Sequence, residues 1–568
     1  MNTEIQLQDK LRKIHRKSYP AYKDLKGSYR FPGYILHIEH VQGDPFAAPS
    51  KLSVEVSQDK AGFPIKLFDK PYKKIALQDY LIRAFGRELS RHMFQAKGSG
   101  KSGLMSISHC GQQVLSRTAL RLDEARILVK FEVGFPANGR TINSQELEKI
   151  LYQYLPDCVR KSLYYRSLDA EKVENVVNLA EDQHAIREEL NRRNLVAFIA
   201  NGSILPRESG VSDKPMKGAV PFQSPPSMEV VLTLPHKGKL AGMGIPRGIT
   251  LIVGGGYHGK STLLKALERG VYNHIQGDGR EFVITDSTAM KIRAEDGRAV
   301  SHVNISPFIN HLPNGKDTVD FSTEDASGST SQAANVVEAL DSGAKTLLID
   351  EDTSATNFMV RDKLMQSVIA RDKEPITSFI EQARTLYEKK GVSTILVAGS
   401  SGAYFSIADH ILQMDTYLAL DITEKVRQIC ECSGGMHPVA DAHVPSSWSQ
   451  QSRILRVGRL ERKHDQIKVK QFGKDSFSLG RETVDLKYVE QIVDPEQVTT
   501  LSYVMKYVAE QLEKNPKAQI GQILPAVCHI LEEKGPVDPS RKNNSPGNLA
   551  QVRPQEIYAC INRYRGFL

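Results

Sequence analysis

Long hydrophobic runs are missing from this sequence of 568 residues. No stretch approaches the roughly 18 to 20 consecutive apolar residues that a membrane-spanning helix needs, and the first residues contain no apolar signal segment. We therefore expect a soluble protein that has no membrane contact and is not fused to a transport channel.

Cysteine is also scarce. Six cysteines are scattered along the chain, which does not build the disulfide framework of a small secreted domain. A reducing compartment is the simpler expectation, so we predict a cytoplasmic protein.

Acidic residues are fewer than basic ones, and the formal net charge is +9. This excess suits a polyanionic partner only if the basic residues gather on one surface.

The length allows several domains, because single hydrophobic cores rarely grow beyond about 250 to 300 residues. Strand-like and helical patterns predict an N-terminal α+β domain at residues 1–200, and a stretch rich in proline, glycine and serine predicts a linker at residues 201–227. In residues 228–449, apolar strands alternate with helices, which is typical of an α/β core with a parallel sheet. Residues 450–568 are predicted to form a C-terminal α+β domain with a basic segment.

A glycine-rich motif follows the apolar strand predicted at residues 249–253. It has the form G-x4-G-K-S, and a strand before it with a helix after it is the context that a phosphate-binding P-loop requires. In such a loop the backbone N–H groups surround the β-phosphate, Lys260 contacts the β and γ oxygens, and the Ser261 hydroxyl ligates Mg²⁺. The predicted nucleotide-contacting residues here are Gly254, Gly255, Gly256, Tyr257, His258, Gly259, Lys260, Ser261 and Thr262.

Two adjacent acids end the apolar strand predicted at residues 346–349. This is the Walker B arrangement, in which the first acid holds Mg²⁺ and the second polarises the attacking water. We therefore predict Asp350 as a metal-binding residue together with Ser261, and Glu351 as the catalytic residue.

Between these motifs, Ser327, Gly328 and Ser329 resemble the signature loop of the ABC ATPases, which reads Leu-Ser-Gly-Gly-Gln. Asp350 follows Ser327 by 23 positions, the separation typical of that family, and residues 352–357 are similar to its D-loop. The resemblance implies ATP and Mg²⁺ as cofactors. It also implies a homodimer paired head to tail, in which the signature residues of one copy complete the nucleotide site of the other.

Two features depart from the ABC transporter pattern. The family carries a switch histidine after the strand predicted at residues 394–397, but this chain reads A-G-S-S-G at residues 398–402. Without that imidazole, slow turnover or a switch-like role is the expectation. In addition, only 67 positions lead from Lys260 to Ser327, which is short for the helical subdomain that docks onto transporter channels.

Further motifs are similar to one unusual group, the ABC-class ATPases found outside transporters. They lie at residues 42–47, 320–325, 374–377 and 561–565. The kinetoplastid mitochondrial member of that group is associated with RNA editing. The resemblance implies an ABC-type P-loop core with flanking N-terminal and C-terminal domains, assembled as a ring-like homodimer with a basic central channel.

A basic segment at residues 453–474 has eight positive charges against two negative ones. Such a run usually means a solvated face, but the link to RNA makes nucleic-acid contact an equal alternative. The chain has no aromatic RNA-recognition motif, so any binding is expected to be led by phosphates and tolerant of sequence. The candidate contact residues are Arg453, Arg456, Arg459, Arg462 and Lys463.

The sequence thus predicts an ATPase that couples Mg²⁺-dependent ATP hydrolysis in a homodimer to nucleic-acid binding or remodelling, with RNA favoured over DNA. The alternative is a nucleotide-gated protein scaffold or regulatory ATPase without nucleic-acid binding. A DNA-repair ATPase related to the chromosome-organising proteins is less favoured, because no long heptad segment interrupts the core.

Overall fold

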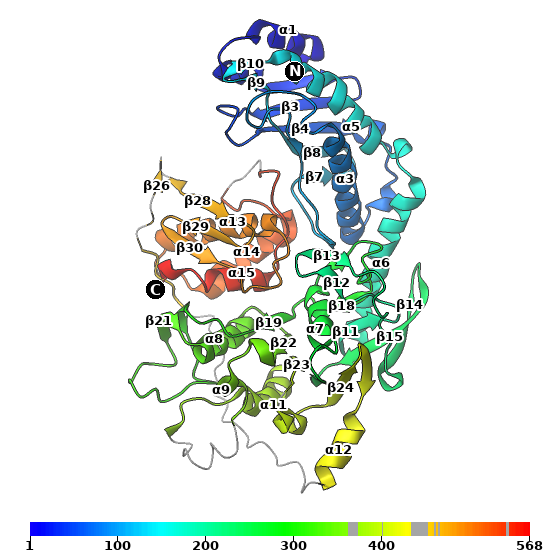
Figure 1. Ribbon diagram of the computed structural model, residues 1–568. Coiled ribbons are helices and arrows are strands. Elements are labelled where there is room, and N and C mark those ends of the chain that lie inside the picture. Colours follow the sequence, from blue (N-terminus) through cyan, green and yellow to red (C-terminus); the bar gives the residue numbers. More distant parts are fainter. Residues whose placement is uncertain are drawn as a thin grey trace. The chain divides into compact units, whose positions relative to one another are not determined.

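The computed structural model describes residues 1–361, 373–399, 401–432, 453–458, 460, 462–463, 466–540 and 545–567. The chain forms two compact units (Figure 1). Unit 1 consists of Met1–Glu181, Gly535–Val537 and Asn543–Gln551. Unit 2 consists of Asp182–Lys534, Asp538–Lys542 and Val552–Leu568.

Unit 1 is an α+β structure built on a mainly antiparallel sheet. The strands follow the order β1-β2-β3-β4-β8-β5, and β7 also pairs with β8. Their bounds are β1 (Asn2–Thr3), β2 (Gly27–Phe31), β3 (Tyr34–His40), β4 (Ser50–Ser57), β5 (Met105–Ser106), β7 (Leu120–Leu122) and β8 (Arg126–Val133). Along β8, buried and partly exposed residues alternate, so one face of the sheet is buried in the core.

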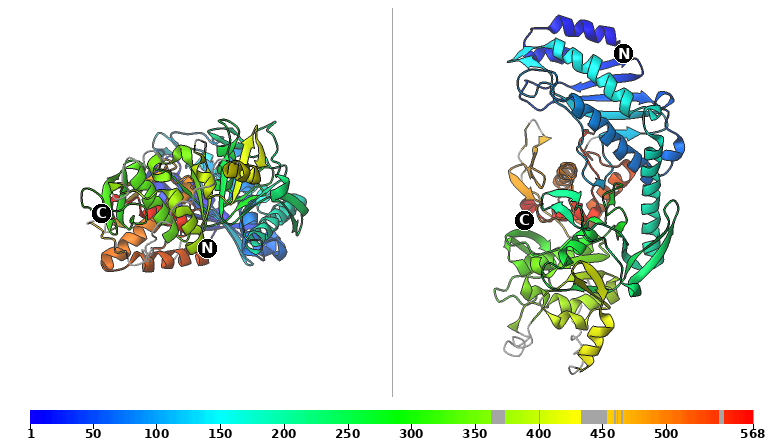
Figure 2. Two further views of the ribbon diagram at one scale, coloured as in Figure 1. Left: turned by 90° about the horizontal axis from the view of Figure 1, so that it is seen from below. Right: turned by 45° about the vertical axis from the view of Figure 1, so that its right-hand side comes forward.

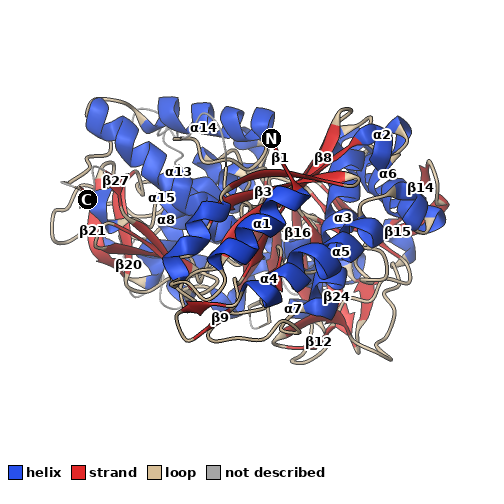
Figure 3. Ribbon diagram, turned by 90° about the horizontal axis from the view of Figure 1, so that it is seen from above, coloured by secondary structure: helices blue, strands red, loops and turns tan. Residues whose placement is uncertain are grey.

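Helices cover that buried face (Figure 3). They are α1 (Glu4–Ile14), α3 (Pro71–His92), α4 (Ser144–Lys149) and α5 (Leu155–Ser162). Leu7 of α1 and Leu81 of α3 share one hydrophobic core with Val129 of β8. The long helix α6 (Ala170–Arg192) contains residues of both units.

Unit 2 contains a parallel sheet with the order β19-β22-β23-β16-β24-β25, in which β25 alone among the described strands runs antiparallel to its neighbour. Its strands are β16 (Ile249–Val253), β19 (Met290–Ile292), β22 (Thr346–Asp350), β23 (Ser393–Val397), β24 (His410–Asp415) and β25 (Leu418–Asp421). Helices α7 (Lys260–Arg269), α8 (Gly328–Asp341) and α11 (Phe379–Lys390) accompany it. The predicted α/β core with a parallel sheet is confirmed.

A second, antiparallel sheet of unit 2 has the order β14-β15-β11-β18. Its strands are β11 (Leu195–Ala200), β14 (Glu229–Leu234), β15 (Gly238–Pro246) and β18 (Val283–Thr285). Residues 201–227, predicted as a linker, contain the hairpin of β12 (Arg207–Ser209) and β13 (Ser212–Pro215). The division of the chain into four parts stays a prediction.

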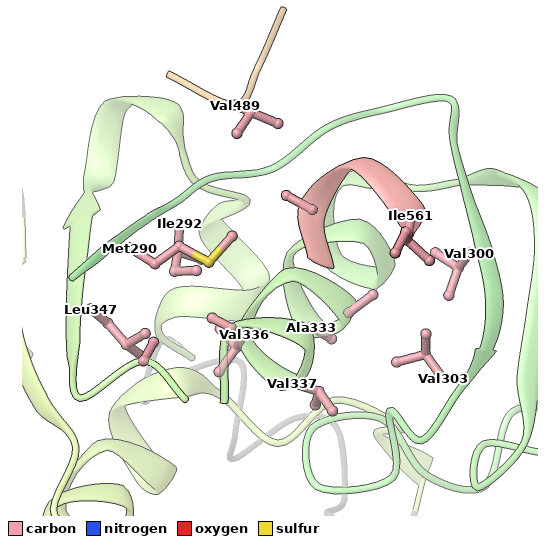
Figure 4. Packing of buried hydrophobic residues seen from close by; sticks show 14 of the residues in the cluster. Met290, Ile292, Val300, Val303, Ala333, Val336, Val337, Leu347, Val489 and Ile561 are labelled. Atoms are coloured by element: carbon pink, nitrogen blue, oxygen red, sulfur yellow. The ribbon is translucent and has the colours of Figure 1, made fainter. Parts of the chain in front are cut away.

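The C-terminal part of unit 2 combines a small sheet with helices that lie against the parallel-sheet region (Figure 2). Its elements are β28 (Val469–Phe472), β29 (Ser476–Leu479), β30 (Glu482–Asp485), α13 (Pro495–Lys514), α14 (Ile520–Lys534) and α15 (Pro554–Ile561). Ile561 of α15 belongs to the same buried cluster as Val336 of α8 and Leu347 of β22 (Figure 4). The C-terminal elements are therefore part of the core that carries the parallel sheet.

Candidate functional site

The glycine-rich motif forms a loop between β16 and α7. Gly254 and Gly259 have φ angles of 142° and 100°, and Tyr257 between them has a φ of 63°. A Cβ atom on Gly254 would lie 2.4 Å from the carbonyl oxygen of Met414, so only glycine fits there. These left-handed positions turn the backbone between β16 and α7.

Lys260, the first residue of α7, points back into that loop. Its Nζ donates hydrogen bonds to the carbonyl oxygens of Gly254 and Gly255, each over 2.7 Å. Gly255 and Gly256 are exposed, and a Cβ on Gly256 would meet no atom within 4 Å. An ammonium group, an open glycine cradle and a helix N-terminus together fit a phosphate chain. Ser261 and Thr262 follow in the first turn of α7.

The sheet order places the two sequence motifs at one edge. Strands β16 and β22 both flank β23, and all three run parallel. Ile252 of β16 and Asp350 of β22 both pair with Val397 of β23, so the carboxyl ends of these strands lie level with one another. In parallel α/β sheets, this edge is where ligands bind.

The acids at this edge approach the phosphate loop. Asp350 is buried, with 7% of its surface exposed, and its Oδ1 accepts a hydrogen bond from the Asp352 N–H over 3.3 Å. Glu351 Oε2 accepts one from the Gly399 N–H over 2.6 Å. A Cβ atom on Gly399 would lie 4.0 Å from Lys260 Nζ, so an acid and a base of the two motifs meet around residue 399.

Gly399 was not among the residues predicted for the site. It lies in the segment where the resemblance expects a switch histidine, and its backbone N–H orients the Glu351 carboxylate. Ser400 lies outside the described residues, and Ser401 accepts a hydrogen bond from the Ala403 N–H over 3.3 Å. One signal could have indicated Gly399. It lies two residues beyond β23, the strand that lies between β16 and β22.

The charged surroundings of Asp350 include a lysine that the sequence motifs do not identify. Burial lowers the pKa of Lys291 on β19, and the carboxylates of Asp350, Glu490 and Glu268 act in the opposite direction. Burial also raises the pKa of Tyr404, and the negative charge of Glu351 adds to that effect. Asp350, Lys291 and Tyr404 therefore lie in a partly desolvated environment, where electrostatic interactions are stronger than in water.

The signature residues begin α8. Ser327 is the N-cap, and its Oγ accepts a hydrogen bond from the Thr330 N–H over 3.4 Å. Ser329 donates to Asn357 Oδ1 over 2.8 Å. The Ala355 N–H donates to Gln332 Oε1, also over 2.8 Å.

These contacts tie α8 to the D-loop of the same chain. Figure 1 shows α8 and α7 apart from each other within unit 2. Ser327, Gly328 and Ser329 stand at the start of α8, whereas the phosphate loop precedes α7.

The basic segment differs from its prediction at Arg453. This residue is 8% exposed and donates hydrogen bonds to the Ser301 carbonyl over 3.2 Å and to Asn562 Oδ1 over 2.6 Å. Burial lowers the pKa of its guanidinium group. The inclusion of Arg453 in a basic surface is therefore wrong, because its donors are used inside the protein.

The other candidates of the basic segment differ in accessibility. Arg456 is exposed. Arg462 is also exposed and forms an ion pair with Glu513 of α13. Arg459 and the side chain of Lys463 lie outside the described residues. Among the described part of the chain, no helix combines the length and the apolar character needed to cross a bilayer.

Models of known families match three consecutive regions of the chain. Residues 4–166 match the N-terminal domain of ATPases of the ABC class, residues 169–445 match the ABC ATPase P-loop domain, and residues 468–567 match the MRB1590 C-terminal domain. Together these matches span most of the sequence, and the phosphate loop, both acids and the signature residues all fall within the second one.

Individual proteins show weaker similarity. The uncharacterized protein MJ1628 of Methanocaldococcus jannaschii is 31% identical over 265 residues, which covers 44% of this chain and 57% of that protein. The chain thus spans little more than half the length of this relative. The solved structure of MJ1267, an ATP-binding cassette of an ABC transporter in its ADP conformation, is 12% identical with a TM-score of 0.25, over 41% of this chain and 94% of that one.

Proposed function

The chain belongs to the P-loop ATPases of the ABC class, and from this premise we propose that it binds ATP with Mg²⁺ and hydrolyses it in a homodimer. The observation that carries the proposal is the meeting of Lys260, Glu351 and Gly399 at the carboxyl edge of the parallel sheet. Two motifs that are about 90 positions apart in sequence approach each other there.

Each residue has a distinct role in this proposal. Lys260 and the backbone N–H groups of residues 254–262 bind the phosphate oxygens. Asp350 and Ser261 would hold Mg²⁺, which when bound neutralises charge on the phosphates. Glu351, held by the Gly399 N–H, orients and polarises the attacking water. Since no imidazole takes part at residues 398–402, turnover is expected to be slow.

The dimer part of the proposal rests on the signature helix. The N-terminus of α8, with Ser327 as its cap, offers backbone N–H groups that favour a negatively charged ligand. Because α8 and α7 are apart within one chain, Ser327, Gly328 and Ser329 are proposed to act on the nucleotide of a second copy.

The first experiment compares ATP turnover of the wild type with that of Glu351→Gln. We expect turnover to fall at least about 100-fold while ATP binding persists, and the ATP-bound variant to accumulate as a dimer in light scattering. Glu388→Gln makes the same chemical change at an exposed position of α11 and serves as the control. Equal turnover in Glu351→Gln and Glu388→Gln would mean that Glu351 takes no part in hydrolysis.

Coupling to nucleic acid is the further part of the proposal. Arg456 and Arg462 are exposed, so they can contact phosphates, with RNA favoured by the family resemblance. Binding through phosphates weakens steeply as salt increases, because counterions are released. We expect RNA binding at low salt that differs between ATP and ADP states. A cytoplasmic location stays a prediction.

The nucleotide-gated scaffold is retained as a second candidate because the basic surface is smaller than the sequence indicated. Arg453 is buried, and Arg462 is paired with Glu513. Steady ATP hydrolysis by a protein that binds no RNA at low salt would favour the scaffold over the nucleic-acid function.

A further inference from the structure

The turn between β24 and β25 lies against the phosphate loop. The Thr416 N–H donates a hydrogen bond to His258 Nδ1 over 2.8 Å, and the Tyr417 N–H donates to the His258 carbonyl over 3.2 Å. A Cβ atom on Gly259 would lie 3.0 Å from Cδ1 of Tyr417. The ring of Tyr417 is thus close to the loop that is proposed to hold the phosphates.

The conformation of this turn is unusual for its residues. Thr416 and Tyr417 have φ angles of 49° and 69°, and both therefore lie in the left-handed region. Two successive residues of this kind form the tight hairpin turns that Asn-Gly or Gly-Gly usually occupy. A β-branched residue and an aromatic one are strained there, and strained positions are enriched at ligand sites.

Tyr417 is also exposed although it is large and aromatic. Its exposed fraction is 48%, and Leu418 and Leu420 on the adjoining strand are exposed to 46% and 44%. The strained turn and the exposed ring of Tyr417 do not contribute to the hydrophobic core. The position of this ring beside the phosphate loop instead suits contact with a flat ligand.

The sheet order indicates which part of a nucleotide would approach this ring. The acids and Gly399 lie on the β23 side of β16, so the terminal phosphate belongs on that side. Strand β24 lies on the opposite side of β16. A phosphate chain that passes through the loop from Glu351 therefore leaves toward the β24–β25 turn, and the nucleoside follows it.

We propose that Tyr417 is the platform on which the base of the bound nucleotide stacks. The inference rests on the proposed ATP binding and adds a residue that none of the sequence motifs contains. Every base has an aromatic face, so the ring supplies affinity without choosing between adenine and guanine. Backbone contacts from residues 416 and 417 keep the ring beside the loop.

The test measures two ligands by titration calorimetry, the non-hydrolysable analogue AMP-PNP and inorganic tripolyphosphate, each with Mg²⁺. Tyr417→Ala is expected to raise the Kd of AMP-PNP about tenfold and to leave the Kd of tripolyphosphate unchanged. Tyr417→Phe retains the ring and should bind both ligands as the wild type does. Leu420→Ala, an equally exposed position of β25, is the matched control and should change neither value.

Three results would overturn the proposal, and they differ from one another. Equal weakening of AMP-PNP and tripolyphosphate by Tyr417→Ala would mean that the turn only supports the phosphate loop. No weakening of AMP-PNP would mean that the base stacks elsewhere. If the wild type binds neither ligand, ATP binding itself fails, and the inference fails with it. Weakening of GTP binding by the same factor as AMP-PNP would support the stacking platform.

Discussion

Unit 2 contains two charged regions that are built in opposite ways. At the edge of the parallel sheet, Lys260 and Glu351 are held by backbone groups, namely two carbonyl oxygens and one N–H. Beneath α8, Arg563 and Glu295 are 7% and 5% exposed and bind each other, with Arg563 Nε lying 3.2 Å from Glu295 Oε2.

The second region is a network rather than a single pair. Asn335 of α8 donates to Glu295 over 3.0 Å, and Arg298 forms an ion pair with Glu338 of the same helix. Charges that satisfy one another inside the protein stabilise one arrangement of α8. Charges held by backbone groups can exchange those contacts for a ligand, and this difference separates a stabilising region from a proposed binding region.

The largest expected effect is on stability, from the replacement Arg563→Ala. It leaves the Glu295 carboxylate buried without its main partner, so the free energy of unfolding should fall by about 3 to 5 kcal/mol. Chemical denaturation measures this change. Arg565→Ala, an exposed arginine two positions further on, should cost less than about 1 kcal/mol. Equal losses in both variants would contradict the contrast between the two regions.

The same pair predicts a pH dependence. Burial by itself would raise the pKa of Glu295, but the guanidinium groups of Arg563 and Arg298 outweigh it and keep that pKa below its usual value. Its stabilising contribution is therefore complete above the unfolded pKa of about 4.3 and is lost as the pH falls through the lower folded value. In Glu295→Gln, stability measured from pH 6 to pH 3 should decline less than in the wild type.

The binding region should respond the other way to substitution. Lys260→Ala is expected to reduce ATP turnover about 100-fold to 1,000-fold, because the phosphates lose a charged partner, while the unfolding free energy changes by less than about 1 kcal/mol. Lys265→Ala, at an exposed position of the same helix, is the control. A large loss of stability in Lys260→Ala would show that this lysine belongs to the stabilising class.

The contrast also explains which features the sequence could predict. The phosphate loop, the strand before it and the acids at the carboxyl end of β22 each depend on a short window of residues, so their elements and the parallel sheet were predicted correctly. The pairing of Arg453 with Asn562 joins residues 109 positions apart, and a spacing of three residues looks the same in a buried and a solvated segment.

The contacts that link distant segments were equally beyond prediction. The bond between Thr416 and His258 spans 158 positions, and that between Arg563 and Glu295 spans 268. Neither pair has a local pattern, because it is the order of the strands and the packing of α15 that bring the partners together. The binding roles assigned to residues 254–262, 327–329, 350 and 351 stay predictions until nucleotide binding is measured.

Substitution of Ser327 tests a residue that both stabilises α8 as its cap and is proposed to bind a nucleotide. Removal of its cap in Ser327→Ala should lower stability by about 1 kcal/mol, and turnover should fall as well if α8 acts on the nucleotide of a second copy. Ser327→Asp retains a capping oxygen but adds a negative charge that would face the phosphates. Its stability should match the wild type while turnover stays low. If Ser327→Asp has both the stability and the turnover of the wild type, Ser327 acts only as the cap of α8.

The smallest effect is expected at the exposed pair of Arg462 and Glu513, whose side chains are 43% and 26% exposed. Such pairs contribute about 0.2 to 1 kcal/mol, so Glu513→Gln should hardly change stability. It removes the negative charge beside the Arg462 guanidinium, however, and a phosphate-binding role then predicts tighter RNA binding with a steeper dependence on salt. Arg462→Gln should weaken binding and reduce the salt slope by about one. If RNA binding is the same in both variants, Arg462 is a solvated surface charge, and the protein-partner scaffold becomes the better account of this segment.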